Sequence, residues 1–138
     1  MRVFVDTNIL IDYVCARQDF CETAERLFVS ALCEEHKLII SDMSYVNTFY
    51  VGHQYGYSNE SLLSVLQKIE SFCETAEMNG QVVHAALHSG WKDFEDSMQY
   101  HAAIASMAEC IVTRNKKDFR TSLIPVYSVE ELLSLPNH

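Results

Sequence analysis

The stretch MRVFVDTNILID, residues 1–12, decides the fold, because an apolar strand ends there at an acid and a helix begins. Val3-Phe4-Val5 is the predicted strand, and Asp6 follows it directly. From Thr7 onward the apolar residues recur at helical spacing, as Ile9, Leu10, Tyr13 and Val14. The stretch therefore predicts a strand–helix unit with a carboxylate at the bend between them.

The same alternation of short apolar strands and helices continues along the chain. Further strands are predicted at residues 38–41, 72–78, 111–113 and 125–127. Helices are predicted from about residue 19, through residues 45–53, after 58, from 82 to about 90, over 95–107, and after 128. This order is typical of a parallel sheet that helices cover on both faces.

Length and charge narrow the class of protein. The chain has 138 residues, which suits a single domain over residues 1–138. Its 10 Lys+Arg against 19 Asp+Glu give a net charge of −9, which argues against coating nucleic acid by bulk electrostatics. No apolar run is long enough for a membrane span, and the N-terminus lacks the pattern of a signal peptide. We therefore expect a cytoplasmic protein with reduced cysteines at positions 15, 21, 33, 73 and 110.

Acidic residues stand where open parallel sheets bind their ligands, outside the carboxyl ends of the strands. Asp6 follows the first strand, Asp93 and Asp96 open a later helix, and Asp118 follows the strand that ends at Thr113. Taken singly, these acids have simpler explanations, as a helix cap, as partners of a helix dipole and as a loop residue.

Together, acids that converge on one edge would repel each other unless a cation joined them. Mg²⁺ or Mn²⁺ suits clustered carboxylates, activates water and offsets charge on a phosphoryl group. The pattern therefore predicts metal-assisted hydrolysis of a phosphodiester.

Four segments carry a resemblance to a known family: MRVFVDTNILID at residues 1–12, ISDMSYVNTFYV at 40–51, DFEDSMQYHAA at 93–103 and IVTRNKKDF at 111–119. In this order, over nearly the whole chain, they resemble the PIN domain family. The resemblance implies a three-layer α/β/α fold with a short, mostly parallel central sheet. It also implies an Mg²⁺- or Mn²⁺-dependent ribonuclease similar to the VapC-type toxins of toxin–antitoxin pairs.

The resemblance assigns roles to individual residues. Asp6, Asp96 and Asp118 would be the catalytic acids and metal ligands, with Asp93 as an additional ligand. Two polar residues match those that support the site, Thr113 and Asn115. The implied partners are an RNA substrate, a small antitoxin protein and a second copy in a homodimer.

Asn47 departs from the family pattern, because the third helix of a PIN domain usually carries an acid at this position. An amide offers a neutral carbonyl oxygen to a cation, but it supplies no charge and cannot act as a general base. The departure leaves open a catalytically weak or inactive PIN-like module that acts through protein contacts. A nuclease directed at DNA or flaps is a third reading, which the small size of the chain disfavours.

Half of the basic residues flank the acidic motifs. Arg114, Lys116, Lys117 and Arg120 fall within seven residues, and Lys92 precedes the acids of the later helix. We expect Arg114, Lys116 and Lys117 to contact RNA phosphates, although a solvated loop would have the same composition. With the low net charge, this predicts a short RNA footprint that is engaged only when the metal is present.

The histidines give a weaker signal. His84 and His88 have a spacing that zinc sites use, but no Cys or Glu completes a set, so we expect no zinc site there. His101 lies one turn after Asp96, so a supporting role at the site remains open.

Overall fold

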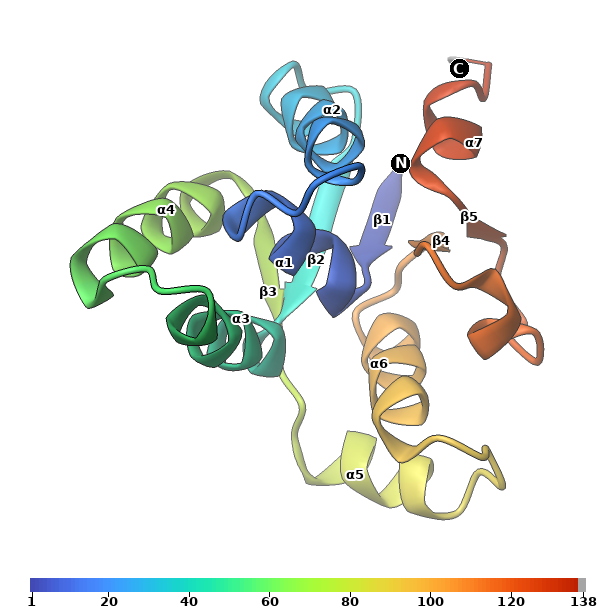
Figure 1. Ribbon diagram of the computed structural model, residues 1–138. Helices are drawn as coiled ribbons and strands as arrows, with labels where there is room; N and C mark the ends of the chain where they lie inside the picture. Colours follow the sequence, from blue (N-terminus) through green and yellow to red (C-terminus); the bar gives the residue numbers. More distant parts are fainter. Residues whose placement is uncertain (137–138) are drawn as a thin grey trace.

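Residues 1–136, which the computed structural model describes, form a five-stranded parallel sheet with helices on both faces (Figure 1). The strand order is β3-β2-β1-β4-β5, and every neighbouring pair is parallel. The strands are β1 (Arg2–Val5), β2 (Lys37–Ser41), β3 (Glu74–Ala76), β4 (Cys110–Val112) and β5 (Val126–Tyr127). The predicted three-layer fold is confirmed, and the sheet is parallel throughout these residues.

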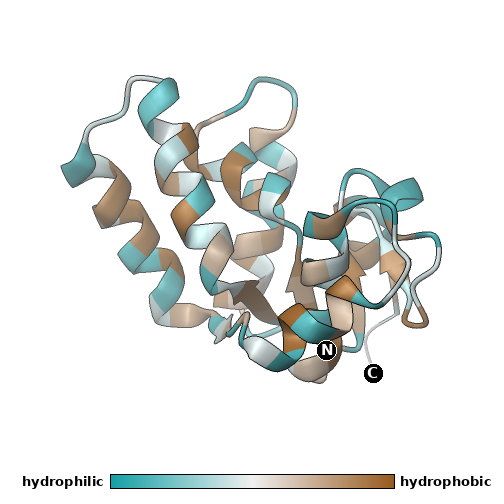
Figure 2. Ribbon diagram, turned by 90° about the horizontal axis from the view of Figure 1, so that it is seen from below, coloured by the Kyte–Doolittle hydropathy of each residue, from teal (hydrophilic) through white to brown (hydrophobic). Residues whose placement is uncertain are grey.

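The helices divide between the two faces of the sheet. One face carries α1 (Thr7–Val14), α2 (Cys21–Leu32), α3 (Asp42–Gln54), α4 (Asn59–Phe72) and α7 (Val129–Leu133). The other carries α5 (Gly80–Leu87), α6 (Phe94–Ala105) and the 3₁₀ helix η1 (Lys116–Phe119). Figure 2 shows hydrophobic residues along the strands and hydrophobic bands that alternate with hydrophilic ones along the helices.

The alternation of side chains along each strand explains why two cores form. Val3 and Val5 pack into the core under α1 and α2, whereas Phe4 between them packs into the core under α6. In β2, Leu38 and Ile40 pack into the first of these cores and Ile39 into the second. Because successive strand residues point to opposite faces, a strand apolar throughout can bury both faces.

Polar side chains begin several helices as the sequence suggested. The Ser58 hydroxyl accepts a hydrogen bond from the Ser61 N–H at the start of α4. Ser128 and Glu131 form a reciprocal capping box at the start of α7. The strand predicted within residues 72–78 is β3, and it lies at one edge of the sheet.

Parallel pairing brings the carboxyl ends of the strands to one edge of the sheet. Asp6 leaves β1 there, and its N–H donates to the Val112 carbonyl at 3.0 Å. Ser41 ends β2 and Thr113 follows β4 at the same edge. This edge therefore gathers residues that lie more than 100 positions apart.

The helices and the cysteines were also compared with the expectations from the sequence. Over residues 1–136, no helix combines the length and the apolar character that a membrane crossing requires. The five cysteines are all free thiols, and three of them are buried.

Candidate active site

Asp6 is held at the edge of the sheet by a hydrogen bond from a neighbouring strand end. Its side chain is only 4% exposed, and the Thr113 hydroxyl donates to Asp6 Oδ2 at 2.7 Å. The Asn115 N–H in turn donates to Thr113 Oγ1 at 3.0 Å. Asp6 occupies the N-cap position of α1, but its carboxylate makes no capping hydrogen bond. The Thr113 hydroxyl therefore fixes the side chain of this acid.

The acids of α6 lie opposite Asp6. Asp93 precedes the helix, and its Oδ1 accepts a hydrogen bond from the Asp96 N–H at 2.9 Å. Asp93 is therefore the N-cap residue of α6, and its side chain holds the first turn of this helix. That turn carries Glu95 and Asp96. Asp118 approaches from η1, which follows β4.

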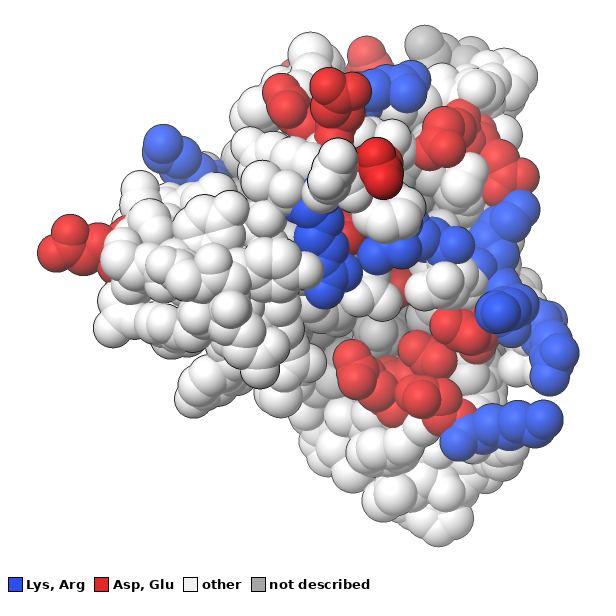
Figure 3. All heavy atoms as spheres, in the orientation of Figure 1, with Lys and Arg blue, Asp and Glu red and all other residues white. Residues whose placement is uncertain are grey.

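These acids line a single cavity of about 470 Å³. Five of its lining residues are carboxylic acids, and none of those in the described part of the chain is Lys, Arg or His. Figure 3 shows acidic side chains gathered on this face, with Lys and Arg at their margin. The acids come from three segments of the fold, the end of β1, the start of α6 and η1: Asp6, Asp93, Glu95, Asp96 and Asp118.

The surroundings raise the pKa of several of these groups. Burial raises the pKa of Asp96, and the charges of Asp93, Asp118, Asp6 and Glu95 raise it further, to about 7. Burial also raises the pKa of Asp6, which the hydrogen bond from the Thr113 hydroxyl opposes. Burial is the largest cause of both shifts, and for Asp96 the neighbouring negative charges, which no basic residue of the described lining offsets, add to it.

The donor set fits a hard divalent cation. In residues 1–136, no three His, Cys, Asp or Glu side chains converge tightly enough to enclose an ion by themselves. Mg²⁺ does not require such a cage, because it usually keeps several waters and takes one or two carboxylates plus substrate phosphates. Carboxylate oxygens that repel one another and lack a cationic partner suit that mode of binding.

Asn47 lies in the same cavity as the acids. It comes from α3, is partly buried and shares the lining with Tyr50 and Val51. The amide thus stands at the site where the family resemblance expects an acid, so α3 contributes no negative charge to the lining.

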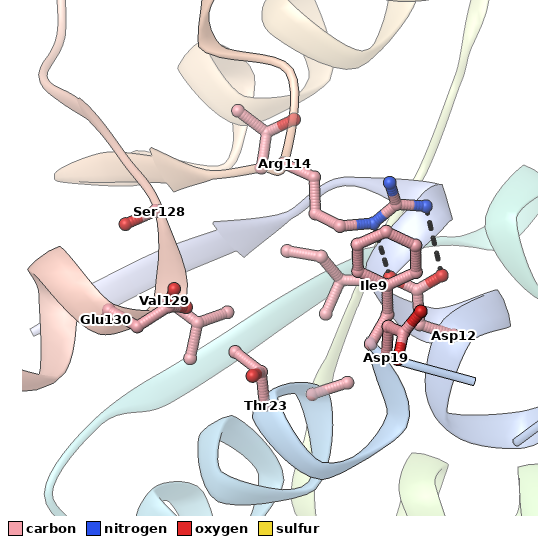
Figure 4. A pocket seen from close by; sticks show the side chains of 11 residues that line it. Ile9, Asp12, Asp19, Thr23, Arg114, Ser128, Val129 and Glu130 are labelled. Atoms are coloured by element: carbon pink, nitrogen blue, oxygen red, sulfur yellow. Dashed lines mark hydrogen bonds and ion pairs between the residues drawn. The ribbon is translucent and has the colours of Figure 1, made fainter. Parts of the chain in front are cut away.

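The basic residues of segment 114–120 do not act together. Arg114 donates from Nε to Asp12 Oδ2 at 2.6 Å and from Nη2 to Asp12 Oδ1 at 3.1 Å. Its guanidinium also stacks over the Phe20 ring at 3.9 Å, in a separate pocket of about 300 Å³ (Figure 4). Lys116 pairs with Glu131 at 2.8 Å. Of the three expected phosphate contacts, the structure places only Lys117 beside the acids.

Sequence reasoning did not single out Gln99 or Asp12. Gln99 is buried, and its Oε1 accepts a hydrogen bond from the Thr7 N–H at 3.1 Å, which ties α6 to the start of α1. Its spacing of three from Asp96 was the available signal, because such residues share a helix face. Asp12 is an acid within the apolar run of α1, and it is 1% exposed. A buried carboxylate requires a charged partner, which the partly exposed Arg114 and Arg17 provide.

The histidines differ in their position relative to the site. His101 Nδ1 lies 2.7 Å from the Ser97 carbonyl, and His101 lines a cavity next to the acids. The rings of His84 and His88 lie 4.3 Å apart on α5, and neither lines the acidic cavity.

Comparison with known proteins identifies the class. The family model of the PIN domain matches residues 2–117, so the chain belongs to the PIN domain family, whose members are generally nucleases. The resemblance found in the four sequence segments is thereby confirmed. A search of the curated proteins found no match.

Solved structures share the fold at low sequence identity. VapBC2 from Rickettsia felis, bound to a DNA fragment from its promoter, is 19% identical, with a TM-score of 0.66. The match covers 93% of this chain and 98% of that one. A toxin–antitoxin complex from Klebsiella pneumoniae is 20% identical with a TM-score of 0.65, covering 92% and 97%. FitAcB from Neisseria gonorrhoeae is 15% identical with a TM-score of 0.55, covering 93% and 98%.

Proposed function

We propose that this protein is a single-domain, Mg²⁺- or Mn²⁺-dependent endoribonuclease and the toxin of a toxin–antitoxin pair. The observation that carries the proposal is the cavity into which five carboxylic acids face without a basic residue among its described lining. The PIN family and the toxin–antitoxin complexes among its structural neighbours support it. The cytoplasm, where RNA and reduced thiols are found, is the compartment we propose for it.

In this proposal, Asp6, Asp96 and Asp118 would hold the metal, with Asp93 as a further ligand. When bound, Mg²⁺ or Mn²⁺ lowers the pKa of water and offsets charge on the phosphoryl group.

Other residues of the chain keep these acids in place. Thr113 fixes the Asp6 carboxylate, and the Asn115 N–H holds the Thr113 hydroxyl. Asp93 caps α6 and so orients Asp96. Lys117 lies where it would meet a backbone phosphate, whereas Arg114 and Lys116 are engaged in ion pairs.

Cleavage of a mixed RNA pool tests the proposal. Wild type should cleave RNA with Mg²⁺ or Mn²⁺ and stop when EDTA is added, and Asp6→Asn and Asp96→Asn should lose the activity. Glu60→Gln is the matched control, because it neutralises an exposed acid at the start of α4. If wild type leaves RNA intact with either metal, or if the site variants cleave as wild type does, the nuclease proposal fails. Single-stranded DNA in a parallel reaction separates a ribonuclease from a DNA nuclease.

The proposed partners are a small antitoxin and a second copy of the chain. The structural neighbours include complexes of a toxin with its antitoxin, which supports this assignment. Co-expression with the product of an adjacent small reading frame should give a stable complex in which RNA cleavage is suppressed. Size-exclusion chromatography with light scattering measures the mass, and a mass of 15.8 kDa for the protein alone would contradict the homodimer.

Asn47 favours a second candidate, a PIN module that acts only through protein contacts. With an amide at this position, the cavity lacks the negative charge that the family resemblance leads us to expect from α3. For this candidate, wild type and Asp6→Asn would be equally inactive on RNA, and both would still bind the partner protein.

A further inference from the structure

A second cavity, of about 700 Å³, adjoins the acidic one and shares three of its carboxylates. It lies between the segment 89–93 before α6 and the region from η1 to Leu123. The shared residues are Asp93, Asp96 and Asp118. A ligand in this cavity would therefore extend directly from the site where we propose cleavage. Its volume is within the range of roughly 300–1,000 Å³ that is typical of small-molecule pockets.

Three basic residues line this second cavity: Lys92, Lys117 and Arg120. All three are exposed. Over residues 1–136, the ion pairs of the protein involve Arg2, Arg17, Arg114 and Lys116. The three residues of the cavity form none of those pairs, so their charges are available to an anionic ligand. An anion would meet them just beyond the acids.

An aromatic wall completes the cavity. Trp91 stacks on the buried Tyr100, with ring centroids 4.8 Å apart and an angle of 27° between the planes. The edge contact with Phe119, at 6.0 Å, further fixes the indole. Trp91 remains partly exposed and lines the cavity with His101. Because the Ser97 carbonyl only accepts hydrogen bonds, its 2.7 Å contact places the proton of His101 on Nδ1. The other ring nitrogen of His101, Nε2, therefore takes no part in this hydrogen bond.

We propose that this cavity is a subsite for the base and the backbone phosphate of the nucleotide next to the scissile phosphate. Lys92, Lys117 and Arg120 would contact the backbone phosphate, and the base would pack against Trp91 beside His101. Basic residues that follow a backbone and an aromatic ring that accepts a base are the two elements of single-strand recognition. A base within a duplex is stacked and paired, so it could not enter a pocket of this kind. The inference rests on the proposed ribonuclease activity.

The fluorescence of Trp91 provides a direct readout, because it is the only tryptophan of the chain. Asp6→Asn, which should not cleave, is titrated with a single-stranded RNA tetranucleotide in the presence of Mg²⁺. Saturable quenching is expected, and a blunt RNA duplex of the same composition should bind at least fivefold more weakly. Absence of quenching by the tetranucleotide, or equal binding of the duplex, would overturn the proposal.

Variants of the basic residues test the phosphate contacts. In the Asp6→Asn background, Lys117→Ala and Arg120→Ala should each raise the Kd at least fivefold. Each should also reduce the slope of log K against log salt by about 0.7, as for one lost contact on a single strand. Lys68→Ala, on the exposed part of α4, is the control and should leave both values unchanged. Unchanged affinity and salt slope in the cavity variants would refute these contacts.

Trp91→Ala and Trp91→Phe test the base contact by steady-state cleavage. Trp91→Ala should raise KM at least fivefold and change kcat less than twofold, and Trp91→Phe should restore most of the loss. A fall in kcat alone would contradict a binding role for this ring. If wild type does not cleave RNA but Trp91 is quenched by the tetranucleotide, the nuclease proposal fails and the binding cavity stands.

Discussion

Replacing Asp96 by Asn is expected to stabilise the metal-free protein at neutral and alkaline pH while it abolishes nuclease activity. Asp96 lies among four other acids, and burial and those charges raise its pKa from 3.8 to about 7. The folded protein therefore binds the Asp96 proton more tightly than the unfolded chain does. Asparagine has the shape of the protonated acid but cannot ionise, so the repulsion disappears.

The sign of the effect follows from proton linkage. Where the folded state binds more protons than the unfolded state, stability falls as pH rises. The free energy of unfolding of wild type should therefore fall between about pH 4 and pH 7 through the ionisation of Asp96. Asp96→Asn lacks this ionisation, so its free energy of unfolding should not show this fall. A shift of about three units corresponds to a ceiling of about 4 kcal/mol. Asp96 is partly exposed, so solvent screening reduces the expected gain to about 1–2 kcal/mol.

Thermal unfolding in EDTA at pH 5, 6, 7 and 8 measures this difference. For a chain of this size, a gain of about 1–2 kcal/mol corresponds to a rise in Tm of roughly 3–10 °C. The rise should grow with pH and level off above pH 7. Glu60→Gln removes one acid elsewhere and should show no such pH-dependent rise. Added Mg²⁺ should reverse the order, because a ligand stabilises only the folded state that binds it.

Two results would refute this reasoning. One is a difference in Tm between Asp96→Asn and wild type that stays the same from pH 5 to pH 8. The other is a metal-free Asp96→Asn protein that is less stable than wild type at pH 8. Either result would mean that the acids in the cavity do not repel one another as the geometry indicates.

Three other substitutions probe the frame of the site. Asp12→Asn breaks the ion pairs that the buried Asp12 makes with the partly exposed Arg17 and Arg114, and it should lower the free energy of unfolding by about 1–3 kcal/mol, measured by urea denaturation. Thr113→Val removes the donor to Asp6 and should cost about 1–3 kcal/mol, so the EDTA-treated variant should unfold at a lower urea concentration. Gly52→Ala places a Cβ against the Leu62 side chain, 3.2 Å from its Cγ, and should cost about 1–3 kcal/mol by the same measurement.

Each of these three predictions has a result that would contradict it. Gly80→Ala is the control for Gly52→Ala, because a Cβ at Gly80 would meet nothing within 4 Å. Because Ala favours a helix more than Gly does, a Gly52→Ala variant as stable as Gly80→Ala would show that Leu62 accommodates the added methyl group. An Asp12→Asn variant as stable as wild type would show that the pair with Arg114 does not hold the loop after β4. If Thr113→Val keeps the stability of wild type, the hydroxyl is dispensable for Asp6.

The sequence predicted the sheet and its edge because those features depend on local patterns. Apolar runs that end at Asp6 and near Thr113 identified two adjacent strands, and parallel pairing then determined that their ends meet. The segment that carries Asp93 and Asp96 was recognisable from the family resemblance. Asn47 was also assigned to the site, and it lines the cavity with the acids.

The roles of the basic residues required the three-dimensional structure. Arg114 and Lys117 are close in sequence, yet one turns back to Asp12 and the other faces the acids. The partner of Arg114 is 102 positions away in the chain, and no local pattern indicates such a pairing. Similarly, Lys92 and Arg120 flank one cavity because the loop before α6 packs beside the segment after η1. Local sequence shows that charges are present, but the path of the loops determines where they point.

The short edge strands of the sheet bear on how the protein behaves when it accumulates. The outermost strands, β3 and β5, have three and two residues, and β3 includes the charged Glu74. An exposed strand edge is a template for pairing with other chains, and short or charged edges suppress such pairing. The apolar strands β1, β2 and β4 are all interior to the sheet. The folded protein at high concentration should therefore resist edge-to-edge aggregation. Any self-association of the folded protein would have to use the helices instead of the strands.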